Sequence, residues 1–408
     1  MNRRKLHQLL LGSTLAPTAI KATEPTGNEL GPLFHSTLDF FGKLQRTKKG
    51  LYLDSYLVGK DKSSNHQCST AAIGVGLIAL CMEHEIKRNP NAQKMALQTL
   101  QTLNGMPGTR EKAGFFRHFF SDRDGTGRSE HSTIDTAIMV VGALFCRNTF
   151  DDRGIHREAD KLWNSINWEL TLATPNGAWL HMIMEDGKPR PKSRTKLFSE
   201  YYILAWLVGE RQQEEDRKGT ILPFEEIPRW EDQGLQLLDD GRKKAHCSFM
   251  IQFPFFMSHA GATNPEYLKL MKAQAQADQR ACSQKTKAPE LWGCGAGITP
   301  TAGYHASDYQ KNPGTMVSPH IIAGFMPALP LARTHLLKHW QNPDRRLKTS
   351  VGEILPRFSL DYPKWKPHRI EAIDYSSMLF GLATLHPYLG MSFFEKNTRF
   401  TFNKNKLG

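Results

Sequence analysis

The segment SEHSTIDTAIMVVGALF, residues 129–145, places two carboxylates at the start of a strongly apolar run. Its apolar positions recur at helical spacing, and Ser132 followed by Asp135 resembles the capped start of a helix. Such an apolar helix is expected to be buried, and buried acids are costly unless they are paired or functional. Asp135 therefore either only stabilises the helix start, or belongs with Glu130 to a polar site at one end of the core.

Two further predicted helices begin in the same way. Glu200 precedes the apolar part of TKLFSEYYILAWLVG (195–209), and Asp374 precedes that of HRIEAIDYSSMLFGLATL (368–385). Burial among aromatic residues would raise the pKa of Glu200, as a general acid requires. Each acid alone is also explained as an ordinary first-turn residue. Three such helices together suggest that several helix N-termini converge on one acidic pocket.

Most other periodic segments also predict helices, and the best strand signal is GAWLHMIM (177–184). STAAIGVGLIALC (69–81) and STIDTAIMVVGALFC (132–146) echo each other with starts 63 residues apart, as expected if alternate helices line one wall. We predict a single all-α domain over residues 23–408, compatible with six helical hairpins closed in a ring. The predicted helices cover residues 71–88, 93–104, 136–150, 157–166, 199–210, 265–282, 326–341 and 376–388.

The N-terminal 22 residues have a basic start and a short apolar stretch, which predicts an export signal cleaved after Ala22. Arg3 and Arg4 resemble the twin-arginine type, an ordinary secretory signal is the alternative, and a periplasmic or secreted location follows. The formal charge is +13, of which residues 1–22 carry +4. The remaining basic residues are scattered, so we expect no nucleic-acid partner. No apolar run reaches about 18 residues, so no membrane span is expected.

The six cysteines contain no C-x-x-C pair, and the sixteen histidines show no ligand spacing, so we predict neither a metal nor a cofactor. Cys81 and Cys146 lie in apolar helical runs and are interpreted as core residues. Cys282 and Cys294 could pair in an oxidising compartment, but the sequence alone does not establish this.

Aromatic residues accompany the acidic segments. AGFFRHFFSD (113–122) and ELWGCGAG (290–297) suggest Phe116 and Trp292 as surfaces for the apolar faces of sugar rings, although a core position explains such a phenylalanine equally well. His118 is a further candidate for substrate contact, with a loop or core role as the alternative. Tyr201, next to Glu200, completes the predicted substrate site.

Taken together, these segments resemble the glucoamylase-like helical-barrel family of bacterial glycoside hydrolases, which includes the endo-β-1,2-glucanases. The resemblance implies an (α/α)6 barrel with short β elements in its loops, and hydrolysis of β-1,2-glucan with inversion. It implies that Glu200 is the general acid and Asp374 the general base, and that Glu130 and Asp135 hold sugar hydroxyls in the cleft. The segments that carry the resemblance are STAAIGVGLIALC (69–81), GFFRHFFSDRDG (114–125), EHSTIDTAIMVVGALF (130–145), LWGCGAG (291–297), TMVSPHIIAGFMPALPLA (315–332) and EAIDYSSM (371–378).

The chain departs from the family pattern beside both proposed catalytic residues. Ser199 stands where the family has Asn before the general acid, and Tyr375 to Ser377 replace Gln-Gly-Pro after the general base. Of the family's Gly-His-Gln-Tyr-Ser-His segment only Ser258 and His259 remain, and Ala296-Gly297 replaces Asp-Gly. These changes suggest altered subsites. The alternatives are a transglycosylase or a hydrolase of another β-glucan with this fold, and a non-catalytic glycan-binding protein. We expect a monomer whose partner is an oligo- or polysaccharide.

Overall fold

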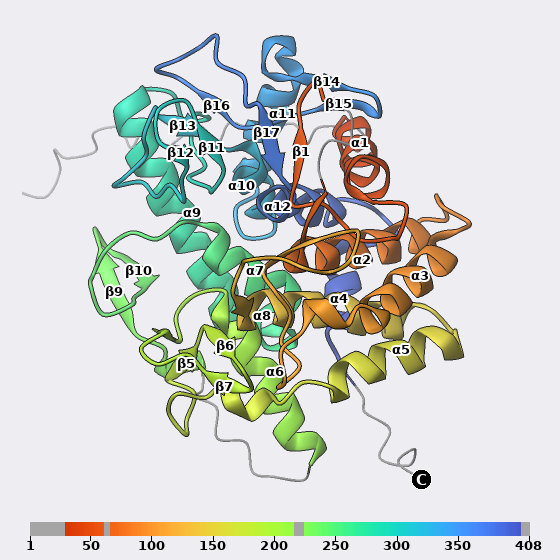
Figure 1. The fold of residues 1–408 in the computed structure, drawn as a ribbon. Helices are drawn as coiled ribbons and strands as arrows, with labels where there is room; N and C mark the ends of the chain where they lie inside the picture. The colour runs from red at the N-terminus through yellow and green to blue at the C-terminus, as the bar shows by residue number, and fades with distance from the viewer. Residues whose placement is uncertain (1–28, 61–65, 216–223, 401–408) are drawn as a thin grey trace, which may run out of the picture.

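The computed structural model describes residues 29–60, 66–215 and 224–400, and Figure 1 shows their arrangement. Helices dominate these residues and the strands are short, which confirms the predicted mainly helical class. The predicted export signal lies outside the described residues. None of the described helices combines the length and the apolar character that crossing a membrane requires.

Six of the described helices contact one another in a closed ring, each touching the next and the last touching the first. They form the centre of the molecule, and some are buried on all sides: every residue of the first of them from Thr70 to Glu83 is buried. In ring order they are α2 (Thr70–Glu85), α4 (Thr133–Thr149), α6 (Tyr201–Glu214), α7 (Phe249–Met257), α10 (Pro319–Gly324) and α12 (Ala372–Ala383).

The remaining helices pack against this ring from outside. One of them buries only one face, with Ile155, Ala159, Leu162 and Trp163 turned inward, as expected for a helix that covers the core. They are α1 (Gly31–Asp39) against α12, α3 (Ala92–Gly105) against α2, α5 (Arg153–Asn164) against α4, α8 (His259–Thr263) and α9 (Pro265–Thr286) against α7, α11 (Leu331–Gln341) against α10, and α13 (Gly390–Asn397) against α4 and α8.

The strands form small antiparallel pairs, and several lead directly into ring helices. The pairs are β1 (Ser55–Leu57) with β17 (Arg369–Glu371), β2 (Gln67–Ser69) with β3 (Phe119–Ser121), β4 (His131–Ser132) with β6 (Ile183–Glu185), β6 with β7 (Lys188–Pro189), β5 (Trp179–His181) with β8 (Arg194–Lys196), β9 (Arg229–Asp232) with β10 (Leu235–Leu238), β11 (Ile298–Thr299) with β12 (Gly303–Tyr304), β13 (Met316–Val317) with β16 (Phe358–Ser359), and β14 (Leu347–Thr349) with β15 (Gly352–Ile354). Strands β2, β4 and β17 run straight into α2, α4 and α12.

The pair β1 and β17 joins the two ends of the described chain. Ser55 pairs with Glu371, and Leu57 pairs with Arg369. The orange β1 and the blue β17 accordingly lie side by side near the start of α12 (Figure 1). This pairing brings an N-terminal segment to the end of the ring where α12 begins.

Two predicted elements have different first or last residues in the structure. The predicted helix over residues 326–341 begins only at Leu331, because Pro330 lacks a backbone N–H and takes the position before the first turn. The predicted strand over residues 177–184 is two short strands, β5 and β6, which pair with different partners. The prediction does not include helices α1, α7, α8, α10 and α13.

The sequence echo marks two neighbouring parallel helices of the ring. Ser69 and Ser132 cap α2 and α4 in the same way, each accepting a hydrogen bond from the backbone N–H three residues later. At the far ends, the sulfurs of Cys81 and Cys146 lie 3.6 Å apart, and both cysteines are fully buried, as predicted for core residues.

Helices α2 and α4 approach so closely that they meet through glycines. A Cβ added to Gly142 would lie 2.3 Å from the carbonyl oxygen of Gly74, which is closer than packed atoms allow. We therefore expect Gly142→Ala to lower the free energy of unfolding by about 1–3 kcal/mol, measured by urea denaturation. Gly105→Ala is the matched control, because a Cβ there meets nothing within 4 Å. Equal stability of Gly142→Ala and the wild type would contradict this packing.

Candidate active site

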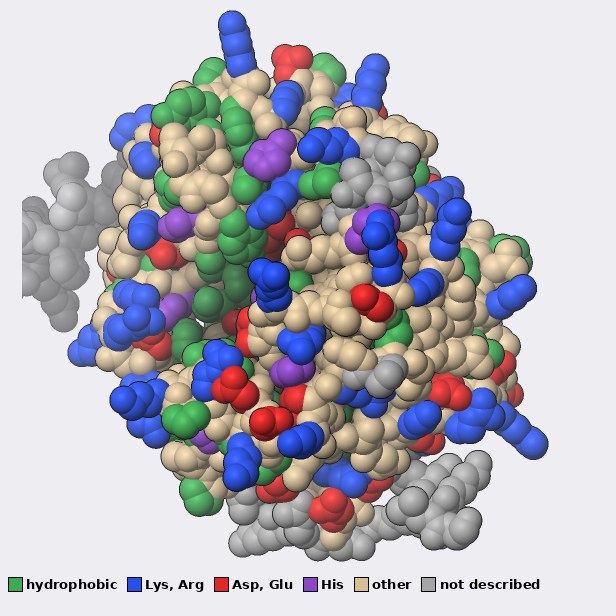
Figure 2. Space-filling view, in the orientation of Figure 1, with side chains coloured by type: hydrophobic (Ala, Val, Ile, Leu, Met, Phe, Trp, Pro, Cys, Tyr) green, Lys and Arg blue, Asp and Glu red, His purple; other side chains and the backbone are tan. Residues whose placement is uncertain are grey.

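The predicted site residues lie at the N-terminal ends of ring helices. Asp135 is in the first turn of α4, Glu200 occupies the N-cap position of α6, and Asp374 is in the first turn of α12. The face shown in Figure 2 is hollowed near its centre, where acidic and apolar side chains are visible, and Lys and Arg side chains are spread around it.

The first group joins Glu130 and Asp135 through one histidine. Nδ1 of His118 lies 2.9 Å from Oε1 of Glu130, and Nε2 lies 3.5 Å from Oδ1 of Asp135. Burial opposes ionisation of Glu130, but its own backbone hydrogen bond and the hydrogen bond and charge of His118 outweigh burial and lower its pKa. Burial dominates at Asp135 and raises its pKa. The Glu130 side chain remains 34% exposed and the Asp135 side chain 13%, so neither is fully enclosed by the core.

The second group is Glu200 with Tyr201. Burial raises the pKa of Glu200 to about 7, and the charge of Asp135 adds to this, against hydrogen bonds from its own backbone and from Ser199. Its Oε2 is buried and has no hydrogen-bond partner among the described residues. Tyr201 is buried beside it, and burial together with the charges of Glu200 and Asp135 raises the pKa of its phenol. Glu200 is therefore a carboxylic acid that keeps its proton near neutral pH and has one oxygen without a partner.

The third group surrounds Asp374. Burial and the negative charge of Glu371 raise the pKa of Asp374 to about 8. Its Oδ1 accepts a hydrogen bond of 3.3 Å from the hydroxyl of Tyr304, while its Oδ2 is buried without a partner among the described residues. Tyr304 as a residue is 48% exposed, so it places a hydroxyl on the acid and leaves part of the side chain open to a ligand.

A small cavity opens beside Asp374. Its volume is about 20 Å³, and His320, Arg357 and Glu371 are among the residues that line it. A cavity of this size has room for a single water molecule. Arg357 is buried, and its Nε and Nη1 atoms have no hydrogen-bond partner among the described residues. Burial lowers the pKa of His320 to about 3, so this histidine is neutral and able to accept or donate a hydrogen bond.

Asp54 connects the three groups, although no sequence pattern predicts it. Burial and the charge of Glu371 raise its pKa to about 6, with smaller effects from Arg369, His118 and Asp135. Asp54 in turn raises the pKa of Asp374, and Asp135 raises that of Glu200. The carboxyl groups of the three helix starts are thus within electrostatic reach of one another through Asp54 and Asp135. We call Asp54, Glu130, Asp135, Glu200, Glu371 and Asp374 the acidic cluster.

Two predicted substrate residues need correction. Phe116 is fully buried, and its ring faces the guanidinium of Arg110 at 4.4 Å. Trp292 is also fully buried, and its indole N–H donates to Nδ1 of His335 at 2.9 Å. Neither ring offers surface to a sugar in this structure, because the segments around them turn their largest side chains into the core. The predicted contact residues His118, Glu130 and Asp135 lie together, and Tyr201 lies beside Glu200.

The acidic cluster combines carboxyl groups whose pKa is raised, such as Glu200 and Asp374, with Glu130, whose pKa is lowered. Such a difference in pKa is what general acid and general base catalysis require. Among the described residues, two groups bring three possible metal ligands within reach of one another, and neither includes a member of the cluster. The fold and the cluster thus define a protein with a closed ring of helices and an acid-rich hollow at one end.

Known structures share this fold. An endo-β-1,2-glucanase from Chitinophaga pinensis, solved with sophorotriose and glucose, superposes with a TM-score of 0.74 at 17% identity, covering 90% of this chain and 94% of its own. A candidate glucoamylase from Bacteroides uniformis superposes with a TM-score of 0.73 at 16% identity, and the match covers 90% of this chain and 93% of the glucoamylase. An endo-β-1,2-glucanase from Talaromyces funiculosus, solved with sophorose, superposes with a TM-score of 0.62 at 10% identity, and the match covers 88% of this chain and 84% of the glucanase.

No family model and no curated protein matches the sequence. At the identities of the solved structures the likeness establishes the fold, and the predicted resemblance to glucoamylase-like helical proteins is confirmed at that level.

Proposed function

We propose that the protein is an inverting glycoside hydrolase that cleaves β-1,2-linked glucan within the chain. The observation that carries this proposal is Glu200, a buried carboxyl with a pKa raised to about 7 and an unpartnered oxygen, set within electrostatic reach of a second group of acids. The shared fold with endo-β-1,2-glucanases supports the choice of substrate.

In this proposal Glu200 donates its proton to the oxygen that leaves with the departing sugar, directly or through a substrate hydroxyl. Asp374 accepts a proton from the water that attacks the anomeric carbon from the opposite face. The cavity beside Asp374 has room for that water, and Arg357 and His320 have nitrogen atoms free to hold it. The oxygen of the water ends on the anomeric carbon, and the bond to the departing sugar breaks.

We assign substrate contacts to the more exposed members of the site. Glu130 and Asp135, joined by His118, would accept hydrogen bonds from sugar hydroxyls. Tyr304 would replace the buried Phe116 and Trp292 as the aromatic surface, because this residue is exposed while its hydroxyl touches Asp374. Sugar rings have apolar faces that suit such a side chain.

We infer that the closed ring of helices is the inner layer of an (α/α)6 barrel. The order of contacts around the ring supports this class. So do the remaining helices, which pack against the ring from outside. We further propose that residues 1–22 direct export, so that the enzyme would meet glucan in the periplasm or outside the cell.

Analysis of the reaction products tests the proposed activity. The protein is incubated with linear β-1,2-glucan, and chain length is followed by chromatography while the new reducing ends are observed by NMR. We expect shortening to oligosaccharides whose new ends first appear as the α anomer, because inversion acts on a β linkage. Initial release of the β anomer would contradict inversion. Products longer than the substrate would indicate a transglycosylase, and binding without shortening would indicate a glycan-binding protein.

A further inference from the structure

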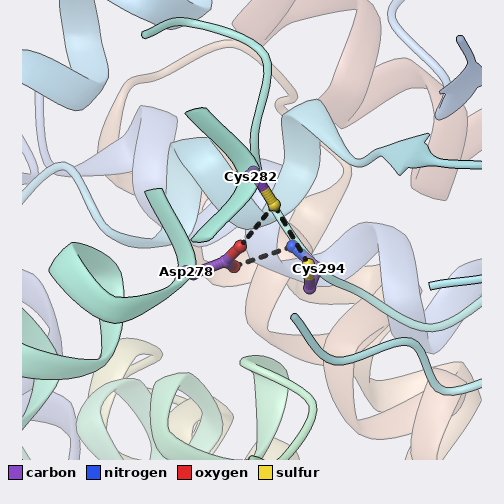
Figure 3. A group of neighbouring side chains, drawn as sticks. All are labelled: Asp278, Cys282 and Cys294. Atoms are coloured by element: carbon purple, nitrogen blue, oxygen red, sulfur yellow. Dashed lines mark hydrogen bonds between the residues drawn. The ribbon is translucent and has the colours of Figure 1, made fainter. Parts of the chain in front are cut away.

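A second cluster of reactive side chains lies outside the acidic cluster. Asp278 and Cys282 are one turn apart on α9, and Cys294 lies in the segment that follows this helix (Figure 3). The sulfur of Cys282 is 3.4 Å from Oδ1 of Asp278 and 3.6 Å from the sulfur of Cys294. All three side chains point toward one another, and each offers one possible metal ligand.

These separations match the edges of a tetrahedral zinc site. With Zn–S bonds of about 2.3 Å and a Zn–O bond of about 2.0 Å, two sulfurs stand about 3.8 Å apart, and a sulfur and an oxygen about 3.5 Å. The distances of 3.6 Å and 3.4 Å agree with these values to within about 0.2 Å. Two of the three edges of such a site are therefore already present, and all three ligand atoms lie within 4.8 Å of one another.

The surroundings hold the carboxylate of Asp278 in a fixed orientation. Its Oδ2 accepts hydrogen bonds from the backbone N–H of Cys294 at 2.7 Å and from the hydroxyl of Ser248 at 3.2 Å. Asp278 is fully buried, and its Oδ1 is left to face the sulfur of Cys282. Orienting contacts of this kind around a ligand are a regular feature of metal sites in proteins.

Space for a fourth ligand is present beside Cys282. A cavity of about 50 Å³ opens there, and the side chain of Asn312 also lines it. This volume holds a water molecule. Cys282 is also the one partly exposed cysteine of the six, so an ion has a route to the site from this side.

We propose that Asp278, Cys282 and Cys294 bind zinc or another thiophilic divalent cation, with water as the fourth ligand. On binding, each thiol S–H bond is replaced by a bond from sulfur to the metal, and the two protons pass to solvent. The divalent charge compensates two thiolates and a carboxylate that would be too costly to bury together without it.

The bound ion would tie the segment of residues 291–297 to α9. This segment continues from Cys294 to Ala296, which lines the cavity at Asp374. It then reaches Gly297, where an added Cβ would meet Arg357 at 3.1 Å and Glu371 at 3.3 Å. The site is therefore structural, and it supports one wall of the acidic cluster without touching substrate.

Zinc binding by variants tests the proposal independently of glucan cleavage. Reduced wild-type protein is dialysed against excess zinc and then against buffer, and metal per chain is measured by mass spectrometry. We expect a single equivalent in the wild type and none in Cys282→Ser. Cys68→Ala is the matched control, because it removes a buried thiol from β2 and should retain the metal. Equal zinc in wild type and Cys282→Ser would overturn the proposal.

A second measurement needs only the wild-type protein, so it remains decisive if Cys282→Ser does not fold. Alkylation of Cys282 by iodoacetamide is followed by peptide mass spectrometry with and without zinc, and we expect zinc to slow it at least about tenfold. Unchanged alkylation would count against the site. So would a Cys282–Cys294 disulfide in the purified protein combined with no zinc uptake after reduction.

Discussion

Glu200→Gln is expected to lower kcat for β-1,2-glucan cleavage by about 10²–10⁴-fold, the usual contribution of a general acid. The amide keeps the size of the side chain but has no proton to give to the leaving oxygen. KM should change little, because no sugar contact is assigned to Glu200. Both constants are measured from the rate of appearance of reducing ends.

Glu210→Gln is the matched control for this prediction. Glu210 lies on the same helix, and burial raises the pKa of its carboxyl too, but it stands near the opposite end of α6. We expect this variant to cleave glucan at the wild-type rate. An equal loss in both variants would point to a general effect on α6, and an active Glu200→Gln would remove Glu200 from the mechanism.

Glu200→Gln should also stabilise the folded protein at alkaline pH. The folded pKa of Glu200 is raised from 4.5 to about 7, so the folded state binds the proton more tightly than the unfolded state. The resulting loss of stability is absent below about pH 4.5, grows as the pH rises toward 7, and is constant above that. Glu200→Gln escapes this loss, so its free energy of unfolding should exceed that of the wild type at pH 8 by on the order of 3 kcal/mol.

The parts of the site that the sequence predicted are those that depend on local order. Asp135, Glu200 and Asp374 each stand where an apolar helix begins, and the helix start is visible from spacing alone. Their convergence follows from ring helices that begin next to short paired strands. The echo between residues 69–81 and 132–146 was visible for the same reason, since adjacent helices repeat the same start.

The parts that the sequence did not predict depend on contacts between distant segments. Asp54 reaches the acidic cluster because β1 pairs with β17 across most of the chain, and short strands give little periodic signal. Tyr304 follows from the turn that pairs β11 with β12. Phe116 and Trp292 stood in segments rich in aromatics and glycine, where composition does not distinguish a ring in the core from a ring in a cleft.

Asp374→Asn is also expected to lower kcat/KM by about 10²–10⁴-fold, because the amide cannot accept the proton of the attacking water. Tyr304 should keep its hydrogen bond to the carboxamide oxygen, so glucan affinity is expected to remain. Cleavage of glucan by Asp374→Asn at the wild-type rate would show that another carboxylate is the base.

The pH dependence of kcat/KM distinguishes Asp374 from its neighbours. Catalysis requires Glu200 with its proton, which is lost above about pH 7, and Asp374 without one, which requires a pH near or above about 8. The rate should therefore follow a narrow bell with its maximum near pH 7.5, where only about 6% of the molecules have Glu200 protonated and Asp374 ionised.

Glu371→Gln should shift the acidic limb of the pH profile of kcat/KM. The negative charge of Glu371 is the second cause, after burial, of the raised pKa of Asp374. Its removal lowers that pKa, so the acidic limb should shift to lower pH and the fraction of active molecules should rise, while the alkaline limb set by Glu200 should stay in place. A variant with a merely disturbed structure would lose rate at every pH. An unmoved acidic limb in Glu371→Gln would mean that the group titrating there is not Asp374.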